Sequence, residues 1–292
     1  MNPKFGVDGV TALLLDERKY DSPLREKELH KLLYFIKQEL EEKGIATDIP
    51  YYWYRYGTVT PIIGSSVTVE KAQDGGSKVV CPVTPDAIDA PEDELDQVRD
   101  VVQEVLLRYY QIGGLQPLTD LMYEDAPYEV QVEFRQLDKQ LRTAADNHPD
   151  LLDDGYDKDD IRRTLSRVVK TFPTDEFPNL ESDLYLWYTV MSTELDQTDQ
   201  FYSVNEMLSL CNAFWTVFMI EVAQQEHSDL TIEEVRNAIS DDVDSYQKQM
   251  RARLENKERE QTKFGAQLER DEVVRDAQDA VAEALVGFAP SQ

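Results

Sequence analysis

Residues 51–61 read YYWYRYGTVTP, and five of the first six are aromatic. Successive side chains of a strand point to opposite faces, so this run places rings on both faces. Exposed tyrosines at such density would be costly, and buried ones need partners for their hydroxyl groups. The stretch therefore predicts a strand over residues 49–56 that ends in a turn. Both faces must be covered, either by the rest of the domain or by another molecule.

A helix is predicted before this strand and a β-hairpin after it. Ser22 is a suitable N-cap, Pro23 suits the first helical position, and Gly44 can end the helix. Residues 67–69 and 79–83 are strand-like and are joined by the turn-rich segment 73–77. Helices followed by a hairpin in this order resemble a winged-helix layout.

The remainder of the chain is predicted to be almost entirely helical. Thr231 with Glu234, and Ser203 with Glu206, each have the spacing of a capping box. The helices are expected at 92–110, 115–123, 128–145, 158–170, 180–195, 204–222, after Thr231, at 251–270 and from 273. Residues 148–156 are rich in Asp, Pro and Gly and predict a boundary. We expect a mainly α-helical α+β protein with two parts. Residues 1–146 form a helical domain with a small antiparallel sheet or wing, and residues 150–288 form an all-helical domain.

The chain is strongly acidic. Its 292 residues include 58 Asp and Glu against 30 Lys and Arg, a net charge of −28. Such a surface repels itself and is tolerable where salt screens it, so we expect a halophilic protein of a salt-rich cytoplasm. Residues 1–60 are nearly neutral, with nine Lys or Arg and ten Asp or Glu. This segment either faces a partner or has less surface to carry charge, and the sequence leaves both explanations open.

Neither a disulfide nor a membrane segment is expected. Cys81 and Cys211 lie in apolar surroundings without CxxC spacing, so we predict reduced, buried thiols. Residues 207–220 carry no charge but are too few to span a bilayer, and they suit a central core helix. The first residues lack the long apolar run of a secretory signal. The predicted localisation is cytoplasmic.

The residue pattern does not indicate catalysis. The three histidines, His30, His148 and His227, fit no recognisable catalytic or metal-binding motif, and no phosphate-binding loop occurs. We therefore expect no enzyme activity, metal or cofactor, and a structural role for His30. Two basic segments have simple explanations. The bases at 162–170 match a helix dipole, although a docking face for an acidic partner or a phosphate backbone stays open. Those at 251–263 suit a solvated helix with i,i+4 pairs or a coiled-coil arm.

Three segments, in order and spacing, resemble the Panacea domain, an antitoxin-associated family found beside diverse toxins and in mobile elements and phages. Residues 31–34, KLLY, are similar to its KLLY signature, and residues 54–61, YRYGTVTP, to its aromatic-x-YGP-x-x-P segment. Residues 118–128, LTDLMYEDAPY, are similar in layout to its third stretch. Thr58 stands where the family prefers proline, Met122-Tyr123 where it has Thr-His, and Tyr128 where it has tryptophan. The resemblance covers residues 24–135.

The resemblance implies a non-enzymatic module that neutralises a toxin or a defence-associated partner by binding it directly. Residues 150–290 lie outside it and have no assigned role. A homodimer through the C-terminal helices stays open. The alternative is a winged-helix DNA-binding regulator, with Lys27, Lys31, Arg55 and Lys78 near the DNA backbone. The residues expected to bind the partner protein are Tyr34, Tyr54, Tyr56, Thr58, Pro61, Tyr123 and Tyr128.

Overall fold

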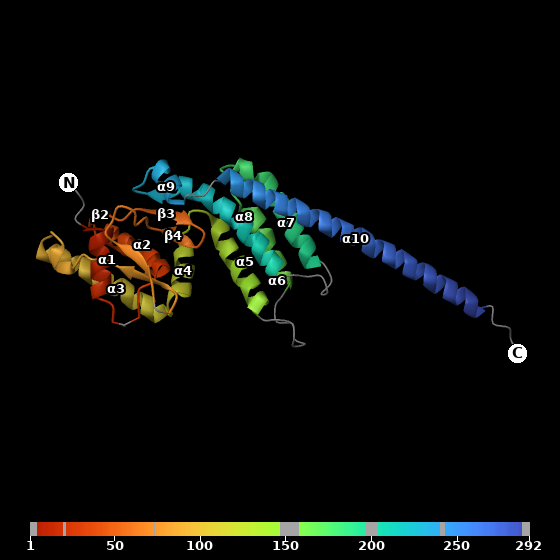
Figure 1. The fold of residues 1–292 in the computed structure, drawn as a ribbon, viewed down its shortest axis with the longest axis horizontal. Coiled ribbons are helices and arrows are strands. Elements are labelled where there is room, and N and C mark those ends of the chain that lie inside the picture. The colour runs from red at the N-terminus through yellow and green to blue at the C-terminus, as the bar shows by residue number, and fades with distance from the viewer. Residues whose placement is uncertain are drawn as a thin grey trace. The chain divides into compact units, whose positions relative to one another are not determined.

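The computed structural model describes residues 5–19, 22–72, 74–146, 158–196, 204–239 and 243–287, with side chains described as far as residue 265. The described residues are mostly helical, with a few strands of two to four residues, so the predicted mainly α-helical α+β class is confirmed. The helices and strands are labelled in chain order (Figure 1).

The helices are α1 (Val7–Asp16), α2 (Glu26–Glu42), α3 (Glu92–Ile112), α4 (Leu115–Glu124), α5 (Glu129–Asp146), α6 (Lys158–Thr171), α7 (Glu181–Asp196), α8 (Val204–Gln225), α9 (Ile232–Ile239) and α10 (Val243–Gly287). The strands are β1 (Phe5–Gly6), β2 (Thr47–Asp48), β3 (Tyr51–Tyr54), β4 (Gly57–Val59), β5 (Thr68–Lys71), β6 (Ser77–Val80) and β7 (His227–Ser228). Two short 3₁₀ helices cover Pro85–Ala87 and Pro178–Leu180.

The chain divides into two compact units. The first comprises Met1–Gln136, Thr171–Pro173 and Trp215–Val243, and the second comprises Leu137–Lys170, Thr174–Phe214 and Asp244–Gln292. Neither unit is continuous in sequence, because residues 215–243 belong with the N-terminal part of the chain. The predicted division into 1–146 and 150–288 stays a prediction.

The aromatic strand β3 is the middle strand of a three-stranded sheet in the first unit, in the order β4-β3-β7. It pairs antiparallel with β4, with Trp53 opposite Thr58, and antiparallel with β7, with Tyr52 opposite His227. The predicted strand and turn are therefore confirmed. Strand β7 was not predicted, and it returns from a segment about 170 residues further along the chain to pair with β3.

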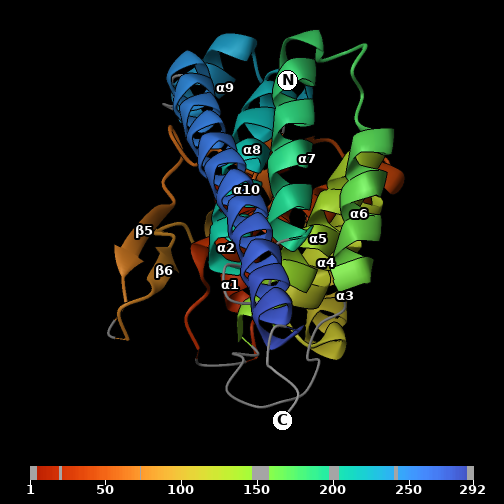
Figure 2. The same ribbon diagram turned by 90° about the vertical axis from the view of Figure 1, so that its right-hand side faces the viewer.

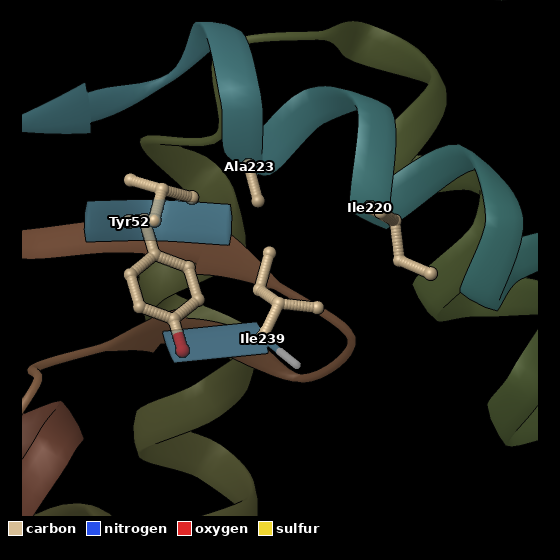
Figure 3. Packing of buried hydrophobic residues seen from close by; sticks show 5 residues of the cluster. Tyr52, Ile220, Ala223 and Ile239 are labelled. Carbon is tan, nitrogen blue, oxygen red and sulfur yellow. The ribbon is translucent and has the colours of Figure 1, made fainter. Parts of the chain in front are cut away.

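The two faces of β3 pack on different parts of the first unit. On one face Tyr52 lies in an apolar cluster with Ile220 and Ala223 of α8 and with Val235 and Ile239 of α9 (Figure 3). On the other face the ring of Trp53 meets the rings of Tyr34 and Tyr123 edge to face. The chain itself thus covers both faces, and no second molecule is needed to bury Tyr52 or Trp53.

Helix α2 begins later than predicted, so the prediction of a cap at Ser22 is wrong. Arg25 is the N-cap residue, and its backbone N–H donates to the Glu28 carboxylate over 2.8 Å. The hydroxyl of Ser77, on strand β6, accepts from the Glu26 N–H over 3.2 Å. The Arg25 guanidinium binds Asp74 at the tip of the β5–β6 hairpin and donates to the Ser77 carbonyl. The predicted hairpin is present (Figure 2). Its residue Ser77 provides the hydrogen-bond acceptor at the N-terminus of α2 that Ser22 was expected to provide.

The second unit is built from α6, α7 and α10 with parts of α5 and α8. Trp187 of α7 stacks on Phe214 of α8 with ring centroids 5.1 Å apart. Helix α10 runs without a break through the two helices predicted at 251–270 and from 273. In the stretch predicted to be a solvated helix with i,i+4 pairs or a coiled-coil arm, Arg259 makes such a pair with Glu255, and three other residues bind carboxylates on other helices. The pairs are Arg251 with Asp183, Arg253 with Glu206, and Lys257 with Glu194.

Several local predictions can be compared directly. The capping box of Thr231 and Glu234 is confirmed, with the Thr231 N–H donating to the Glu234 carboxylate over 2.8 Å. Ser203 of the other box lies outside the described residues. Both cysteines are free thiols, but Cys81 is half-buried rather than buried. In the described part of the chain one helix, α8, has the length and apolar composition of a membrane span, and most of that stretch is buried, as in a core helix.

Candidate functional site

The turn that joins β3 to β4, residues 54–58, is held in place by hydrogen bonds from helices that are distant in sequence. The carbonyl oxygen of Arg55 accepts two hydrogen bonds, from the Tyr123 hydroxyl over 3.1 Å and from the Trp215 indole N–H over 2.6 Å. These donors come from α4 and α8, both far from the turn in sequence. Two donors on one carbonyl fix the orientation of that peptide, since each hydrogen bond restricts its rotation.

The other side of the turn is held by α2 and α4. The ammonium of Lys31 donates to the Thr58 carbonyl over 3.0 Å. The Thr58 N–H and the sulfur of Met122 lie 3.3 Å apart, and the Thr60 N–H donates to His30 Nδ1 over 3.3 Å. The three segments that resemble the Panacea domain, around residues 31, 58 and 122, therefore meet at one turn.

Gly57 is required by this arrangement. Its φ is +97°, a region in which residues with a side chain are strained. A Cβ atom at this position would lie 2.5 Å from the Met122 sulfur and 3.1 Å from Lys31 Nζ. The glycine thus allows both side chains to approach the backbone of the turn.

His30 and Lys31, which contact the turn from α2, are buried, and the pKa of each is lowered. Lys31 is 5% exposed, and its pKa is lowered to about 7, mainly by burial and further by the nearby cations Lys27 and Arg135. Burial, with the charge of Lys31, lowers the pKa of His30 to about 4. Because the His30 ring is buried and accepts the Thr60 N–H, it has the structural role predicted from the sequence.

The predicted partner-binding residues fall into three groups by exposure. Four are buried, two are half-buried, and Tyr56 alone among them is exposed, at 41%. The buried residues are Tyr34, Thr58, Tyr123 and Tyr128, and the half-buried ones are Tyr54 and Pro61. A buried side chain supports the surface without contacting a partner. The residues that remain available for contact are therefore Tyr56, Tyr54 and Pro61.

The structure brings most of these residues together, but not all of them. Tyr54, Tyr56 and Thr58 belong to the turn itself, and Tyr123 donates to it. Tyr128 instead packs its ring on Phe218 of α8, with its hydroxyl 3.3 Å from the Gln225 side chain. Pro61 lies further along, where it lines an open groove of about 590 Å³ together with Ile63, which is 84% exposed.

Two cations lie on aromatic rings of the turn, one on the exposed ring of Tyr56 and one on the half-buried ring of Tyr54. The Lys27 ammonium is 5.6 Å from the centroid of the Tyr56 ring, and the Arg55 guanidinium is 5.4 Å from that of Tyr54. Contacts of this kind stabilise an exposed ring in one orientation by about 0.5–1 kcal/mol. From the sequence Lys27 is expected only as a contact to DNA, and its pairing with Tyr56 is not predicted. The pairing joins α2 to a turn that lies 29 positions away, and no local pattern indicates it.

Other kinds of site find less support in the described residues. No group of three or more His, Cys, Asp or Glu side chains within them is placed to hold a common metal ion. Of the four basic residues named for DNA binding, Lys27 and Lys78 are exposed and Arg55 is half-buried. Lys31 is buried against Thr58 and is not placed to reach a phosphate backbone.

No family model, curated protein or solved structure matches this chain. The likeness to the Panacea domain therefore stays an interpretation of the three sequence segments.

Proposed function

We propose that this protein is a non-enzymatic, antitoxin-like module that neutralises a toxin or defence-associated protein by binding it directly, in a salt-rich cytoplasm. The proposed contact surface is the β3–β4 turn with Tyr56 at its centre. The resemblance of three sequence segments to an antitoxin-associated family supports the class of function. The geometry of the turn supports the location.

The observation that carries the proposal is that an exposed tyrosine lies on a backbone fixed from below. Hydrogen bonds from Tyr123, Trp215 and Lys31 hold the two carbonyls on either side of Tyr56 and Gly57. A ring presented in this way loses little conformational freedom when it is buried by a partner, and preorganisation increases affinity. Tyrosine is also among the residues that most often contribute a large share of binding free energy.

High salt favours this mode of recognition. Salt screens attraction between exposed charges, whereas the burial of apolar surface is strengthened by salts that are excluded from proteins. An aromatic contact surface therefore keeps its affinity where an ionic one loses it. The nearly neutral charge of residues 1–60, against a net −27 for the rest, agrees with a contact surface in this part of the chain.

The test is co-expression of the full chain with the product of the adjacent gene, followed by affinity purification and a count of surviving cells. We expect the neighbour to co-purify at unit stoichiometry and its toxicity to be suppressed. Tyr56→Ala should weaken binding about 30-fold or more, as expected for a central aromatic residue. The matched control is Tyr246→Ala, which removes an equally exposed tyrosine from α10 and should leave binding unchanged.

Two results would contradict the proposal. One is co-purification and survival that do not change in the Tyr56→Ala protein. The other is sequence-specific retention of duplex DNA by the chain alone, with an affinity that falls steeply with salt, because this would identify the DNA-binding alternative.

A further inference from the structure

Next to the β3–β4 turn, helix α2 carries two lysines whose arrangement does not stabilise the helix. Lys27 and Lys31 lie four residues apart on α2, so they are neighbours on one side of the helix. Like charges at this spacing destabilise a helix, and Lys31 is in addition buried.

The electrostatic consequence is a local excess of positive charge. The pKa of Lys31 is lowered by Lys27 and Arg135 in addition to burial, so these cations contribute to the field at Lys31. Arg135 is bound to Asp120 over 2.8 Å, which partly neutralises it. Lys27 is exposed and lies on the Tyr56 ring at the surface. Lys31 is only partly protonated near pH 7, so Lys27 supplies the exposed positive charge of the corner formed by Lys27, Lys31 and Tyr56, which is cationic and partly aromatic.

Unfavourable local arrangements of this kind concentrate at functional sites, where a ligand compensates for them. We propose that the corner formed by Lys27, Lys31 and Tyr56 binds an acidic segment of the partner protein. A carboxylate of that segment accepts from the Lys27 ammonium, and an adjacent apolar side chain packs on the Tyr56 ring. This inference rests on the proposed function and specifies the chemistry of the partner.

Charge complementarity selects this occupant. Residues 61–292 carry a net charge of −27, so an acidic segment is repelled by most of the chain. At this corner the acidic segment is attracted instead. Such attraction sets the position and orientation of the bound segment as much as it adds affinity. Burial of the ring supplies the part of the binding free energy that salt does not screen.

The test uses the ¹⁵N-labelled full chain and two short peptides at constant ionic strength. The probe is acetyl-Glu-Glu-Phe-Glu-Glu-amide, and its neutral counterpart has Gln in place of each Glu. We expect saturable shifts of the Tyr56 and Gly57 amide signals with the acidic peptide, and at least threefold weaker binding of the neutral one. Lys27→Gln should weaken binding of the acidic peptide about three- to fivefold, the size expected for one exposed charge pair.

The control variant is Lys43→Gln, which removes an exposed lysine at the other end of α2, where it pairs with Glu104. It should change the affinity less than twofold. Equal binding of the two peptides, equal losses in both variants, or no saturable shift would overturn the inference. A phosphorylated or nucleic-acid ligand that binds this corner while the acidic peptide does not would overturn it as well.

The failure of this inference differs from the failure of the proposed function. If Tyr56→Ala abolishes capture of the neighbouring gene product while Lys27→Gln does not, the protein-binding function holds and the acidic partner is wrong. If neither variant affects capture, the turn is not the contact surface.

Discussion

Replacement of Lys31 by methionine tests whether the ammonium below the turn is buried at a cost to stability. The pKa of Lys31 is lowered from 10.5 to about 7. A pKa difference of one corresponds to about 1.4 kcal/mol, so below about pH 7, where Lys31 is protonated in both states, the folded state of the natural protein is less stable by roughly 5 kcal/mol. Methionine is of similar length and removes this penalty.

The sign follows from proton binding. Between about pH 7 and 10.5 the unfolded chain binds the Lys31 proton and the folded chain does not, so stability rises with pH in this window. Below about pH 7 the penalty is constant. Methionine also leaves the Thr58 carbonyl without its donor, which costs about 1–2 kcal/mol at every pH. We expect Lys31→Met to be more stable by about 3 kcal/mol near pH 6 and slightly less stable near pH 10.

The assay is urea unfolding of both proteins followed by tryptophan fluorescence at several pH values and constant salt. Effects of all other titrating groups cancel in the difference between the two proteins to a first approximation. Lys43→Met, which removes an exposed lysine from the C-cap position of the same helix, should show a difference that hardly varies with pH. A difference between natural protein and Lys31→Met that is independent of pH would refute the reasoning.

Four further substitutions, at three positions, test contacts within the first unit. Gly57→Ala combines a positive φ with a close approach to the Met122 sulfur and should lower the free energy of unfolding by about 2–4 kcal/mol in urea titration; a neutral effect would show that the turn can move. Tyr52→Ala empties the cluster on the other face of β3 and should cost about 3–5 kcal/mol in the same assay, unless that face is loosely packed. Asp229→Ala removes a partner, at 2.7 Å, of the buried ammonium of Lys37 and should cost about 1–3 kcal/mol, since Glu41 remains. Asp229→Asn should cost less because asparagine tolerates the positive φ at this position and keeps a hydrogen-bond acceptor; equal losses in the two variants would show that charge alone matters.

The sequence predicted the elements that depend on neighbouring residues. The aromatic strand, the turn at Gly57 and the capping box at Thr231 follow from alternation, backbone freedom and side-chain spacing. These features involve residues within a few positions of one another. They could therefore be predicted without knowledge of the tertiary structure.

Features that join distant residues could not be predicted in this way. The α2 N-terminus is completed by Ser77, about 50 positions away, so the nearby Ser22 was chosen wrongly. The cover of Tyr52 by α8 and α9 depends on the return of residues 215–243 to the first unit. Neither contact produces a pattern in the neighbouring sequence. Any apolar helix could pack on Tyr52, so the sequence does not indicate which one does.

The candidate site shows the same limit. Motif residues were expected at a contact surface, but three of them are buried. Tyr123 donates to the turn, Thr58 is part of it, and Tyr34 packs on Trp53. An aromatic residue that carries a hydroxyl serves equally in a core and at an interface, and its type does not distinguish the two. The exposed fraction of each side chain does distinguish them. It reduces the predicted partner-binding residues to Tyr56, which is exposed, and to Tyr54 and Pro61, which are half-buried.

Site-specific photo-crosslinking shows whether the Tyr56 turn contacts the partner protein. Benzoylphenylalanine is placed at position 56 in one protein and at position 185 of α7, also an exposed tyrosine, in another. Each protein is irradiated in cells that carry the adjacent gene. We expect one abundant adduct of a single partner from position 56 and none from position 185. An adduct from position 185 with none from position 56 would contradict this expectation.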